Sequence, residues 1–400
     1  MDVDDVAWLA SRFGEKALST ASDLLLRPDT LISDLATLRA RYPGRDAALV
    51  DVIRGRRRAR GRLRRADDLL LDDASAQQAT AASVAVHRAR RIASATPGAV
   101  VHDVTCSIGA ELLELTATSG IAGVIGSDLD PARAAMAAHN VPAAVVAVAD
   151  ALTPTSTADV VIADPARRDA TGARKFRLED LRPGLFELLS VYAGHSLVVK
   201  CAPGLDHRML RDRFGFVGET EVVSVDGGVR EVALWTGDQD LPRRRATVIR
   251  SAGGGFEITD DEPDDVPVAP VGRWIVDPDG AVVRAGLVRH YAARHGLWQL
   301  DHRIAHLTGD AVPAGERGWP VFEQMPLSEK GLRRRLVDLD CGVLEILVRG
   351  VDVDPDRLRT RLRLRGSRSL ALVVTRIGTA ATVFICGPGE RAGDAAGPTR

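Results

Sequence analysis

The sequence predicts an α/β protein with a doubly wound, mostly parallel sheet at its centre, a helical region before it and a small α+β domain after it. Three observations support this prediction. Between residues 98 and about 240, apolar runs alternate with helical stretches. Before this part, apolar residues recur at three- and four-residue spacings, which indicates amphipathic helices. After it, a final segment has the order strand, helix, strand, helix, strand, strand.

Length and composition set the limits of this prediction. The 400 residues, 45% of them hydrophobic, are enough for two or three globular domains. A net charge of −1 means that any surface for nucleic acid must be local. The four cysteines are far apart, which argues against a zinc site or a disulfide framework and fits a reducing compartment. The N-terminus does not resemble a signal peptide and no stretch is suited to span a bilayer, so we expect a cytoplasmic protein without membrane contact or bound metal.

Residues 1–95 are expected to form a helical domain. Asp29 or Thr30 is a suitable cap for one helix, which Pro43-Gly44 would end. A later helix is predicted from about residue 77 to residue 92.

Residues 96–250 are expected to form the central domain. Strands are predicted at 99–104, 122–127, 143–148, 158–163, 195–200, 219–225 and 229–236. Helices are predicted at 109–118, 131–139, 178–192 and 206–213. This alternation implies a parallel sheet covered on both faces. No helix separates the last two strands, which Asp226-Gly227-Gly228 would join as a hairpin.

The C-terminal part divides into three segments. Residues 251–318 begin with a Gly-, Asp- and Pro-rich stretch and are expected to be a linker or surface hairpin with a short mixed segment. Residues 319–388 are expected to form the small α+β domain, of the split βαβ, ferredoxin-like type. Residues 389–400 are expected to be a disordered tail.

The turn after the first strand is suited to hold a ligand. In VVHDVTCSIGAELLEL, a buried strand ends at Asp103, a tight turn runs from Thr105 to Gly109, and a helix follows. A helix that begins after a strand presents free amide groups, and small turn residues let a ligand approach the backbone. An ordinary strand-to-helix turn of any α/β protein is the alternative.

Two acidic residues extend this candidate cofactor site. Asp128 ends the second strand, in VIGSDLDP, where a carboxylate can accept hydrogen bonds from ribose hydroxyls. Asp150 follows the third strand, where it would either meet an adenine amino group or cap its own loop. The same geometry serves nicotinamide cofactors, so the pattern alone does not name the cofactor.

The fourth strand ends in ADVVIADPARRD, beyond which a doubly wound sheet binds its ligands. Asp164 is predicted to accept a hydrogen bond from an amine or the edge of a base, and Pro165 to fix the backbone there. Arg167 and Arg168 are predicted to hold a phosphate or carboxylate. A strand terminator with solvated arginines is the alternative.

The fifth strand, in SLVVKCAPGLDH, places Lys200 and Cys201 beside the same predicted ligand site. We predict that Lys200 contacts the substrate. Cys201 is either a nucleophile or a small buried residue, and we favour the second interpretation.

With these motifs in order, the chain resembles bacterial class I S-adenosylmethionine-dependent methyltransferases that carry a C-terminal THUMP-like domain. Five strand-helix units followed by a hairpin form the strand inventory of that class. The segments ASAQQATAASVAVHRARRI and PLSEKGLRRRL extend the resemblance over nearly the whole chain. The usual turn, D-x-G-x-G-x-G, keeps only its last glycine here, at Gly109. The motif Asp164-Pro165-Ala166-Arg167 lacks the aromatic of base amino-methyltransferases, which argues against methylation of a base amine.

The resemblance implies a Rossmann-like domain that binds S-adenosylmethionine through Asp103, Thr105, Gly109, Asp128 and Asp150. It also implies direct methyl transfer, with Asp164, Pro165 and Arg167 as catalytic residues, and RNA as the leading substrate.

An arginine-rich run gives independent support for RNA. Eight of the twelve residues from Arg54 to Arg65 are arginine and none is acidic. We predict RNA contacts from Arg56, Arg57 and Arg58. The alternative is a surface neutralised by nearby aspartates. A second group of arginines lies between Arg357 and Arg368.

Two other functions are consistent with the sequence. The protein could methylate a small molecule or another protein, and would then bind the cofactor but not RNA. It could also be a non-catalytic RNA-binding factor with a degenerate cofactor site, since Thr105 and Ser107 replace two expected glycines.

Overall fold

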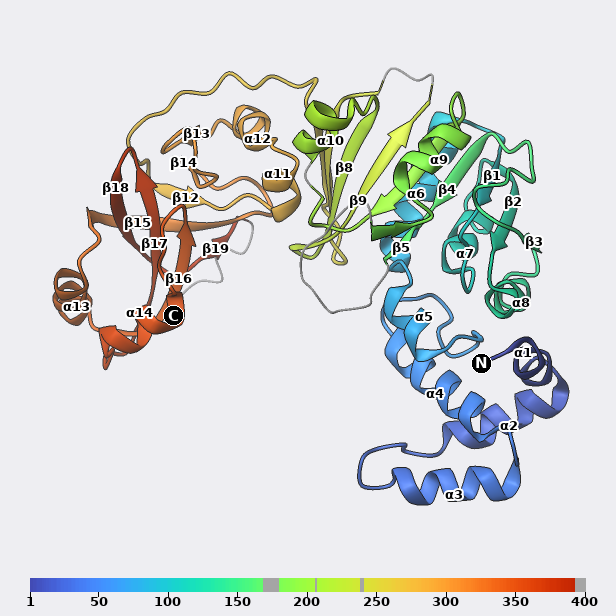
Figure 1. Cartoon of the computed structure of the whole chain (residues 1–400). Coiled ribbons are helices and arrows are strands. Elements are labelled where there is room, and N and C mark those ends of the chain that lie inside the picture. The colour runs from blue at the N-terminus through green and yellow to red at the C-terminus, as the bar shows by residue number, and fades with distance from the viewer. Residues whose placement is uncertain (168–179, 206, 238–240, 393–400) are drawn as a thin grey trace. The chain divides into compact units, whose positions relative to one another are not determined.

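The computed structural model describes residues 1–167, 180–205, 207–237 and 241–392 (Figure 1). The chain forms two compact units. The first contains residues 1–225 and 230–241, and the second contains residues 226–229 and 242–400. The helical region and the central sheet, which we expected to be separate domains, therefore share the first unit.

The N-terminal region is helical, as predicted. Its helices are α1 (Val3–Leu9), α2 (Arg12–Ser22), α3 (Leu31–Arg41), α4 (Asp46–Ala59), α5 (Asp73–Gln78) and α6 (Ala82–Ala95). Thr30 immediately precedes α3, but its side chain makes no capping hydrogen bond. The helix predicted at about 77–92 is instead two helices, because Ala79 and Ala81 both adopt extended backbone conformations. Thr80 between them contacts the central domain through Lys200.

The central sheet has the predicted α/β topology. Its strands in the first unit are β1 (Ala99–Asp103), β2 (Ile121–Asp128), β3 (Val145–Val148), β4 (Val160–Ala163), β7 (Ser196–Cys201), β8 (Glu219–Val225) and β9 (Gly228–Thr236). They are ordered β8-β9-β7-β4-β1-β2-β3, with β1, β2, β3, β4 and β7 parallel and β9 antiparallel to β7. Asp226 and Gly227 both have positive φ, which suits the tight hairpin turn predicted between the last two strands. The parallel order brings the carboxyl ends of β1, β2 and β4 to one edge.

The connecting helices are α7 (Ala110–Thr116), α8 (Pro131–Asn140), α9 (Leu185–Val191) and α10 (His207–Phe214). The helix predicted at 178–192 begins only at Leu185. Pro183 disfavours helical conformation in the residue before it, and Gly184 is the N-cap. The preceding Leu181–Arg182 is strand β6, which pairs with β5 (Ala166–Arg167).

One hydrophobic core joins the helical region to the sheet. Leu49 and Leu70 belong to the same buried cluster as Ile108 and Met136. The Asn140 side chain reinforces this junction, since it exchanges hydrogen bonds of 2.7 and 2.8 Å with the backbone of Leu70 and donates to the Ile108 carbonyl at 2.9 Å. The N-terminal helices are therefore part of the scaffold of the candidate site.

The main part of the second unit begins at residue 242, within the range predicted for the central domain, and it includes the whole segment 251–318 that was predicted as a linker. Its elements are β10 (Arg244–Ile249), β11 (Phe256–Thr259), β12 (Trp274–Val276), α11 (Gly280–Arg284), α12 (Val288–His295), β13 (Trp298–Gln299) and β14 (Leu307–Gly309). β10 and β11 form an antiparallel hairpin. β12, β13 and β14 join the sheet of the C-terminal domain. With only two or three residues each, these strands are too short to show a period of two in the sequence.

The small α+β domain has the predicted element order. It consists of β15 (Arg317–Pro326), α13 (Glu329–Asp338), β16 (Cys341–Arg349), α14 (Pro355–Leu362), β17 (Arg368–Ile377) and β18 (Ala380–Cys386). The sheet order is β15-β18-β17-β16, so β16 and β17 are adjacent and parallel. The two strands of the βαβ unit around α14 therefore have no other strand between them. β19 (Glu390–Arg391), within the predicted disordered tail, pairs with β15, and residues 393–400 lie outside the described residues.

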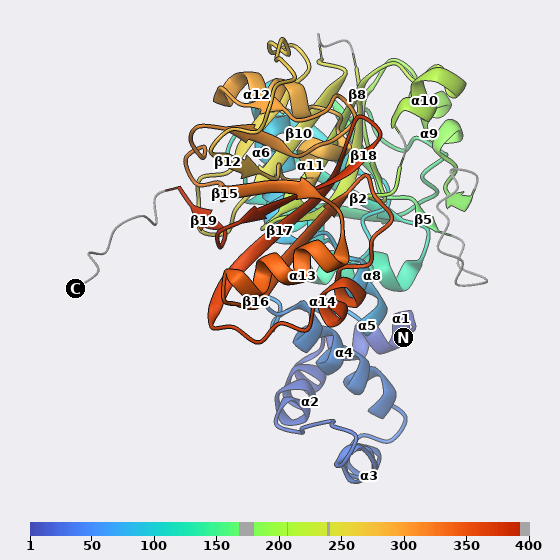
Figure 2. The ribbon, with the colours of Figure 1, turned by 90° about the vertical axis from the view of Figure 1, so that its left-hand side faces the viewer.

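Two apolar layers cover the C-terminal sheet. Leu332 and Leu336 of α13 and Leu358 of α14 pack with Leu372 on one face, where Figure 2 shows the two helices side by side. Ile275 and Trp319 belong to the cluster on the other face. Across the residues described here, no helix combines the length and apolarity needed to cross a membrane.

Candidate functional site

The turn after β1 brings three predicted cofactor residues together. Asp103 is buried, and its Oδ1 accepts hydrogen bonds from the Thr105 amide at 3.0 Å and the Thr105 hydroxyl at 3.4 Å. Gly109 has φ of +80°, and a Cβ there would lie 3.0 Å from the Val141 side chain. Both constraints favour glycine at this position.

Ser107 occupies one of the positions where the family motif has glycine, yet it keeps a left-handed backbone with φ of +49°. Its amide donates a 2.9 Å hydrogen bond to Oδ2 of Asp128, which helps to hold this unusual conformation. The other Asp128 oxygen accepts from the Asp130 amide at 2.9 Å. A carboxylate has about four acceptor positions, so Asp128 retains acceptor capacity at the end of β2.

Asp150 is exposed after β3, and its Oδ1 accepts a 2.9 Å hydrogen bond from the Leu152 amide. This contact is the loop-capping role that the sequence left open beside an adenine contact. Asp130 caps α8 by accepting from the Ala132 amide at 2.8 Å.

The Asp164-Pro165-Ala166-Arg167 segment lies at the end of β4, against the β1 turn. The Asp164 amide donates to the Thr105 hydroxyl at 2.6 Å, which ties the two motifs together. Pairing of β5 with β6 fixes the backbone of Ala166 and Arg167. The Arg167 side chain and the whole of Arg168 lie outside the described residues, so their predicted anion contacts stay predictions.

Lys200 is turned toward Asp164. Its ammonium lies 2.5 Å from Oδ2 of Asp164 and also donates to the Thr80 hydroxyl. The Lys200 side chain is only 9% exposed, whereas that of Asp164 is 43% exposed. Asp164 is therefore the member of this pair that a substrate can reach. Lys200 contacts the Asp164 carboxylate from the buried side.

A buried charge network continues from Lys200 into the protein. Glu111 lies 3.7 Å from the Lys200 ammonium and 3.3 Å from Nε of Arg88. The Arg88 guanidinium also donates to Glu231 at 3.2 Å. With every group ionised, Asp103, Glu111, Asp164 and Glu231 would carry four negative charges, against two positive charges on Arg88 and Lys200. This excess of acid would suit a cationic ligand.

Burial and these neighbours shift the ionisation of the site. Burial raises the pKa of Asp103 to about 7, although Lys200 opposes the shift. Burial alone would lower the pKa of Lys200, but Asp164 and Glu111 outweigh it and raise that pKa above its ordinary value. The Cys201 thiol is buried, and burial raises its pKa. Cys201 thus stays a protonated thiol near neutral pH, which favours the structural interpretation of this residue.

The arginines predicted to bind RNA are engaged within the first unit. Nε of Arg56 donates to the Leu69 carbonyl at 2.8 Å. Arg57 donates to the carbonyls of Ser22, Leu24 and Leu25. Arg58 pairs with Asp73 at 2.6 Å. Of these three arginines, Arg58 is neutralised by an aspartate, as in the alternative to RNA binding, whereas Arg56 and Arg57 bond to carbonyls and keep their positive charges.

Sequence reasoning did not identify Thr80, Arg88, Glu111 or Glu231. The available signal was weak, because Glu111 and Arg88 are charged residues on otherwise apolar helix faces. Their meeting depends on packing of α6 and α7 at the sheet, which the sequence pattern does not specify.

Comparisons with known proteins identify the family and the fold of this chain. The THUMP domain-like family matches residues 316–388. Relatives from two strains of Mycobacterium tuberculosis, CDC 1551 / Oshkosh and H37Rv, are each described as an uncharacterized S-adenosylmethionine-dependent methyltransferase. Each is 52% identical over 367 residues, which cover 88% of this chain and 99% of the relative.

A solved structure shares the fold over nearly the full length. The crystal structure of a candidate methyltransferase from Porphyromonas gingivalis W83 aligns with a TM-score of 0.73 and 20% identity. The alignment covers 98% of this chain and 99% of that one. It thus includes the helical region, the central sheet and the C-terminal domain.

Proposed function

This chain belongs to the S-adenosylmethionine-dependent methyltransferases, and on that premise we propose that it methylates RNA by direct transfer at the carboxyl edge of the central sheet. The observation that carries the site assignment is Asp164, which is held by Thr105 and Lys200 with its carboxylate partly exposed.

The residues around the β1 turn fit the cofactor. Asp128 retains acceptor positions for ribose hydroxyls, and Asp103 lies at the base of the turn. When bound, S-adenosylmethionine supplies a methyl group already activated by its sulfonium charge. The acidic excess of Asp103, Glu111, Asp164 and Glu231 is complementary to that charge. Thr105 and Ser107 replace glycines while keeping the turn in contact with Asp164 and Asp128, which argues against a decayed site.

In the proposed mechanism, Asp164 orients the acceptor through a hydrogen bond to its Oδ1, while Oδ2 stays bonded to Lys200. Lys200 is a positioning residue, because its ammonium is buried and occupied by Thr80 and Asp164. Pro165 and the β5–β6 pair keep the backbone fixed. Arg167 is assigned to a phosphate of the acceptor.

The assignment of RNA as the substrate is supported by the THUMP domain-like match and by exposed arginines of the C-terminal domain. Arg363, Arg365 and Arg368 are exposed in and around the loop between α14 and β17. Arginine forks recognise phosphates well, so this loop is the proposed contact with the RNA backbone. A small molecule or protein acceptor is the second candidate, and it would need none of these arginines.

Labelled methyl transfer to total RNA tests the proposal. Wild-type protein with labelled S-adenosylmethionine should label RNA, and Asp164→Ala should lower turnover by about a hundredfold or more while weakening cofactor binding far less, because three of the four acidic groups remain. The control is Asp180→Ala, which removes a carboxylate from an exposed position. Asp159 is unsuitable for this purpose because its side chain accepts a hydrogen bond from the Val100 amide. Unchanged turnover in Asp164→Ala would overturn the catalytic assignment. If protein were labelled but RNA were not, the methyl acceptor would be a protein.

A further inference from the structure

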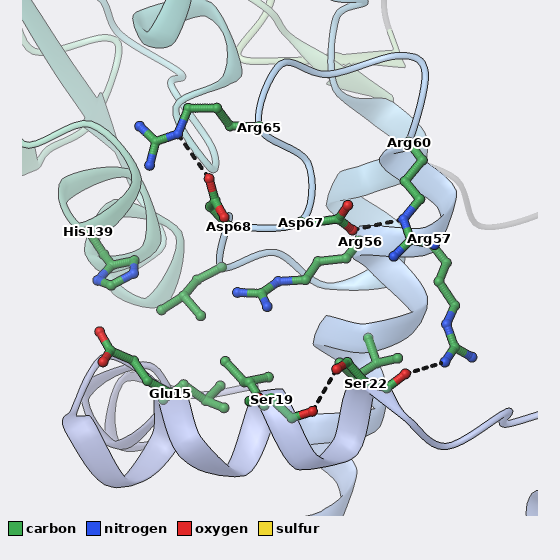
Figure 3. A pocket seen from close by; sticks show the side chains of 14 residues that line it. Glu15, Ser19, Ser22, Arg56, Arg57, Arg60, Arg65, Asp67, Asp68 and His139 are labelled. Atoms are coloured by element: carbon green, nitrogen blue, oxygen red, sulfur yellow. Dashed lines mark hydrogen bonds and ion pairs between the residues drawn. The ribbon is translucent and has the colours of Figure 1, made fainter.

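A pocket that shares no lining residue with the candidate methyl-transfer site lies within the first unit. It has a volume of about 610 Å³ and is formed by α2, α4, the segment after α4 and the end of α8 (Figure 3). Its lining includes none of the residues assigned above to the cofactor or to Asp164 and its partners. Its volume falls in the range of small-ligand sites.

Four arginines and three carboxylates line this pocket, which leaves a formal excess of one positive charge when histidine is neutral. Three of the arginines are already compensated. Arg60 pairs with Asp67 at 2.8 Å, Arg65 pairs with Asp68 at 3.2 Å, and Arg57 donates to backbone carbonyls. Among the described residues, Arg56 is the pocket arginine that has neither an ion pair with an acid nor a hydrogen bond from its terminal nitrogens.

Arg56 is anchored at one edge and open at the other. Its Nε donates to the Leu69 carbonyl at 2.8 Å, which fixes the plane of the guanidinium. Within the described parts of the chain, its two terminal nitrogens have no hydrogen-bond partner, and Figure 3 shows them projecting into the pocket. Burial lowers the pKa of this guanidinium, although the pair Asp68 and Asp67 opposes the shift. A partly buried cation with two free donors is stabilised by an anion that accepts both.

The opposite wall offers neutral and acidic groups. His139, at the end of α8, faces the pocket beside Glu15 of α2 (Figure 3). Burial lowers the pKa of His139, so its ring is neutral at pH 7 and can both donate and accept. The Glu15 carboxylate can accept from a hydroxyl or an amine but would repel an anion placed against it. A matching ligand therefore has an anionic end toward Arg56 and hydrogen-bond donors toward Glu15.

We propose that this pocket binds a nucleotide, with its phosphate on the terminal nitrogens of Arg56 and its ribose or base toward His139 and Glu15. The shared chemistry is a phosphate attached to a nucleoside, supplied either by a free mononucleotide or by one residue of an RNA chain. Arginine matches a phosphate through two parallel hydrogen bonds, which a lysine cannot reproduce. The proposal does not require methyl transfer, because no residue of the pocket belongs to that site.

Calorimetric titration of the full chain without S-adenosylmethionine tests the proposal. The probes are the four ribonucleoside 5′-monophosphates, the matching nucleosides, and a single-stranded oligoribonucleotide. Arg56→Gln should weaken binding of the phosphate-bearing probes by about tenfold or more, and Arg56→Lys should recover only part of the loss. The exposed Arg12→Gln makes the same charge change on α2 and should leave binding unchanged.

A second variant covers the case in which Arg56→Gln loosens the contact with Leu69. Ser19 lines the pocket, so Ser19→Phe should fill it and abolish binding without removing a cation. Binding of monophosphates assigns a free nucleotide to the pocket, and binding of the oligonucleotide alone assigns an RNA phosphate. Binding of nucleosides as tight as that of monophosphates, binding insensitive to both variants, or no binding of any probe would overturn the proposal. Cofactor titration of the same variants should be unchanged, which separates this test from that of methyl transfer.

Discussion

Two arginine-rich stretches, residues 54–65 in the first unit and 357–368 in the second, differ in how many of their side chains are engaged within the fold. In the run from Arg54 to Arg65, most guanidinium groups bond to backbone carbonyls or to aspartates of the same unit. In the second unit, Arg363, Arg365 and Arg368 are exposed. The second stretch also contains paired arginines, since Arg357, Arg359 and Arg361 contact acidic residues, but no such contact is found for Arg363, Arg365 or Arg368 among the described residues. A basic run therefore predicts a nucleic-acid surface only when its surroundings leave its charges unpaired.

Replacement of Arg88 should show the largest effect of an arginine that pairs with acids inside the fold. Replacing it with methionine would leave Glu111 and Glu231 buried without their shared cation, and we expect a loss of about 3–5 kcal/mol in the free energy of unfolding of the first unit. Arg90→Met, at an exposed position of the same helix, should change stability by less than about 0.5 kcal/mol. Denaturant unfolding measures both. Equal stability of the two variants would show that the buried network contributes little.

Arg57 tests whether the run stabilises the fold or binds RNA. Arg57→Ala removes three hydrogen bonds to carbonyls around the end of α2, and we expect a loss of about 1–2 kcal/mol. The exposed Arg54→Ala on the same helix should cost less than about 0.5 kcal/mol. If RNA affinity fell with Arg57→Ala while stability stayed constant, the nucleic-acid interpretation of the run would be restored.

The sequence predicted the sheet better than the site. Strands such as β1 and β4 were located within about two residues because they are apolar runs bounded by Asp103 and Asp164. The β5–β6 pair was missed because two-residue strands have no periodicity, and the break at Thr80 because its cause lies in the tertiary structure. Asp103, Asp128 and Asp164 were proposed for the site because apolar strands precede them, and the structure places each at a strand end. Arg88, Glu111 and Glu231 were not proposed, since only packing brings them together.

Asp103 extends the comparison from cations to a buried acid. Burial raises its pKa to about 7, so the carboxyl is half ionised near neutral pH. If the ionised form faces a cationic cofactor, affinity for S-adenosylmethionine should rise by about tenfold from about pH 6 to about pH 8, because deprotonation supplies the matching charge. Calorimetric titration across this range measures the rise. Asp103→Asn should bind weakly at every pH, and a flat wild-type profile would remove Asp103 from the cofactor's electrostatics.

The exposed arginines of the second unit should have the smallest effect on stability. Replacing Arg363, Arg365 and Arg368 together with glutamine should change the free energy of unfolding by less than about 0.5 kcal/mol. RNA affinity should fall, and the slope of log affinity against log salt should decrease by about one for each RNA phosphate that an arginine no longer neutralises. The matched control replaces the exposed Arg12, Arg27 and Arg41, which changes net charge equally. Equal reductions in RNA affinity for both triple variants would mean that binding depends on overall charge. A reduction found only for the variant of Arg363, Arg365 and Arg368 would mean that exposure at the THUMP-like domain separates an RNA-binding arginine from a structural one.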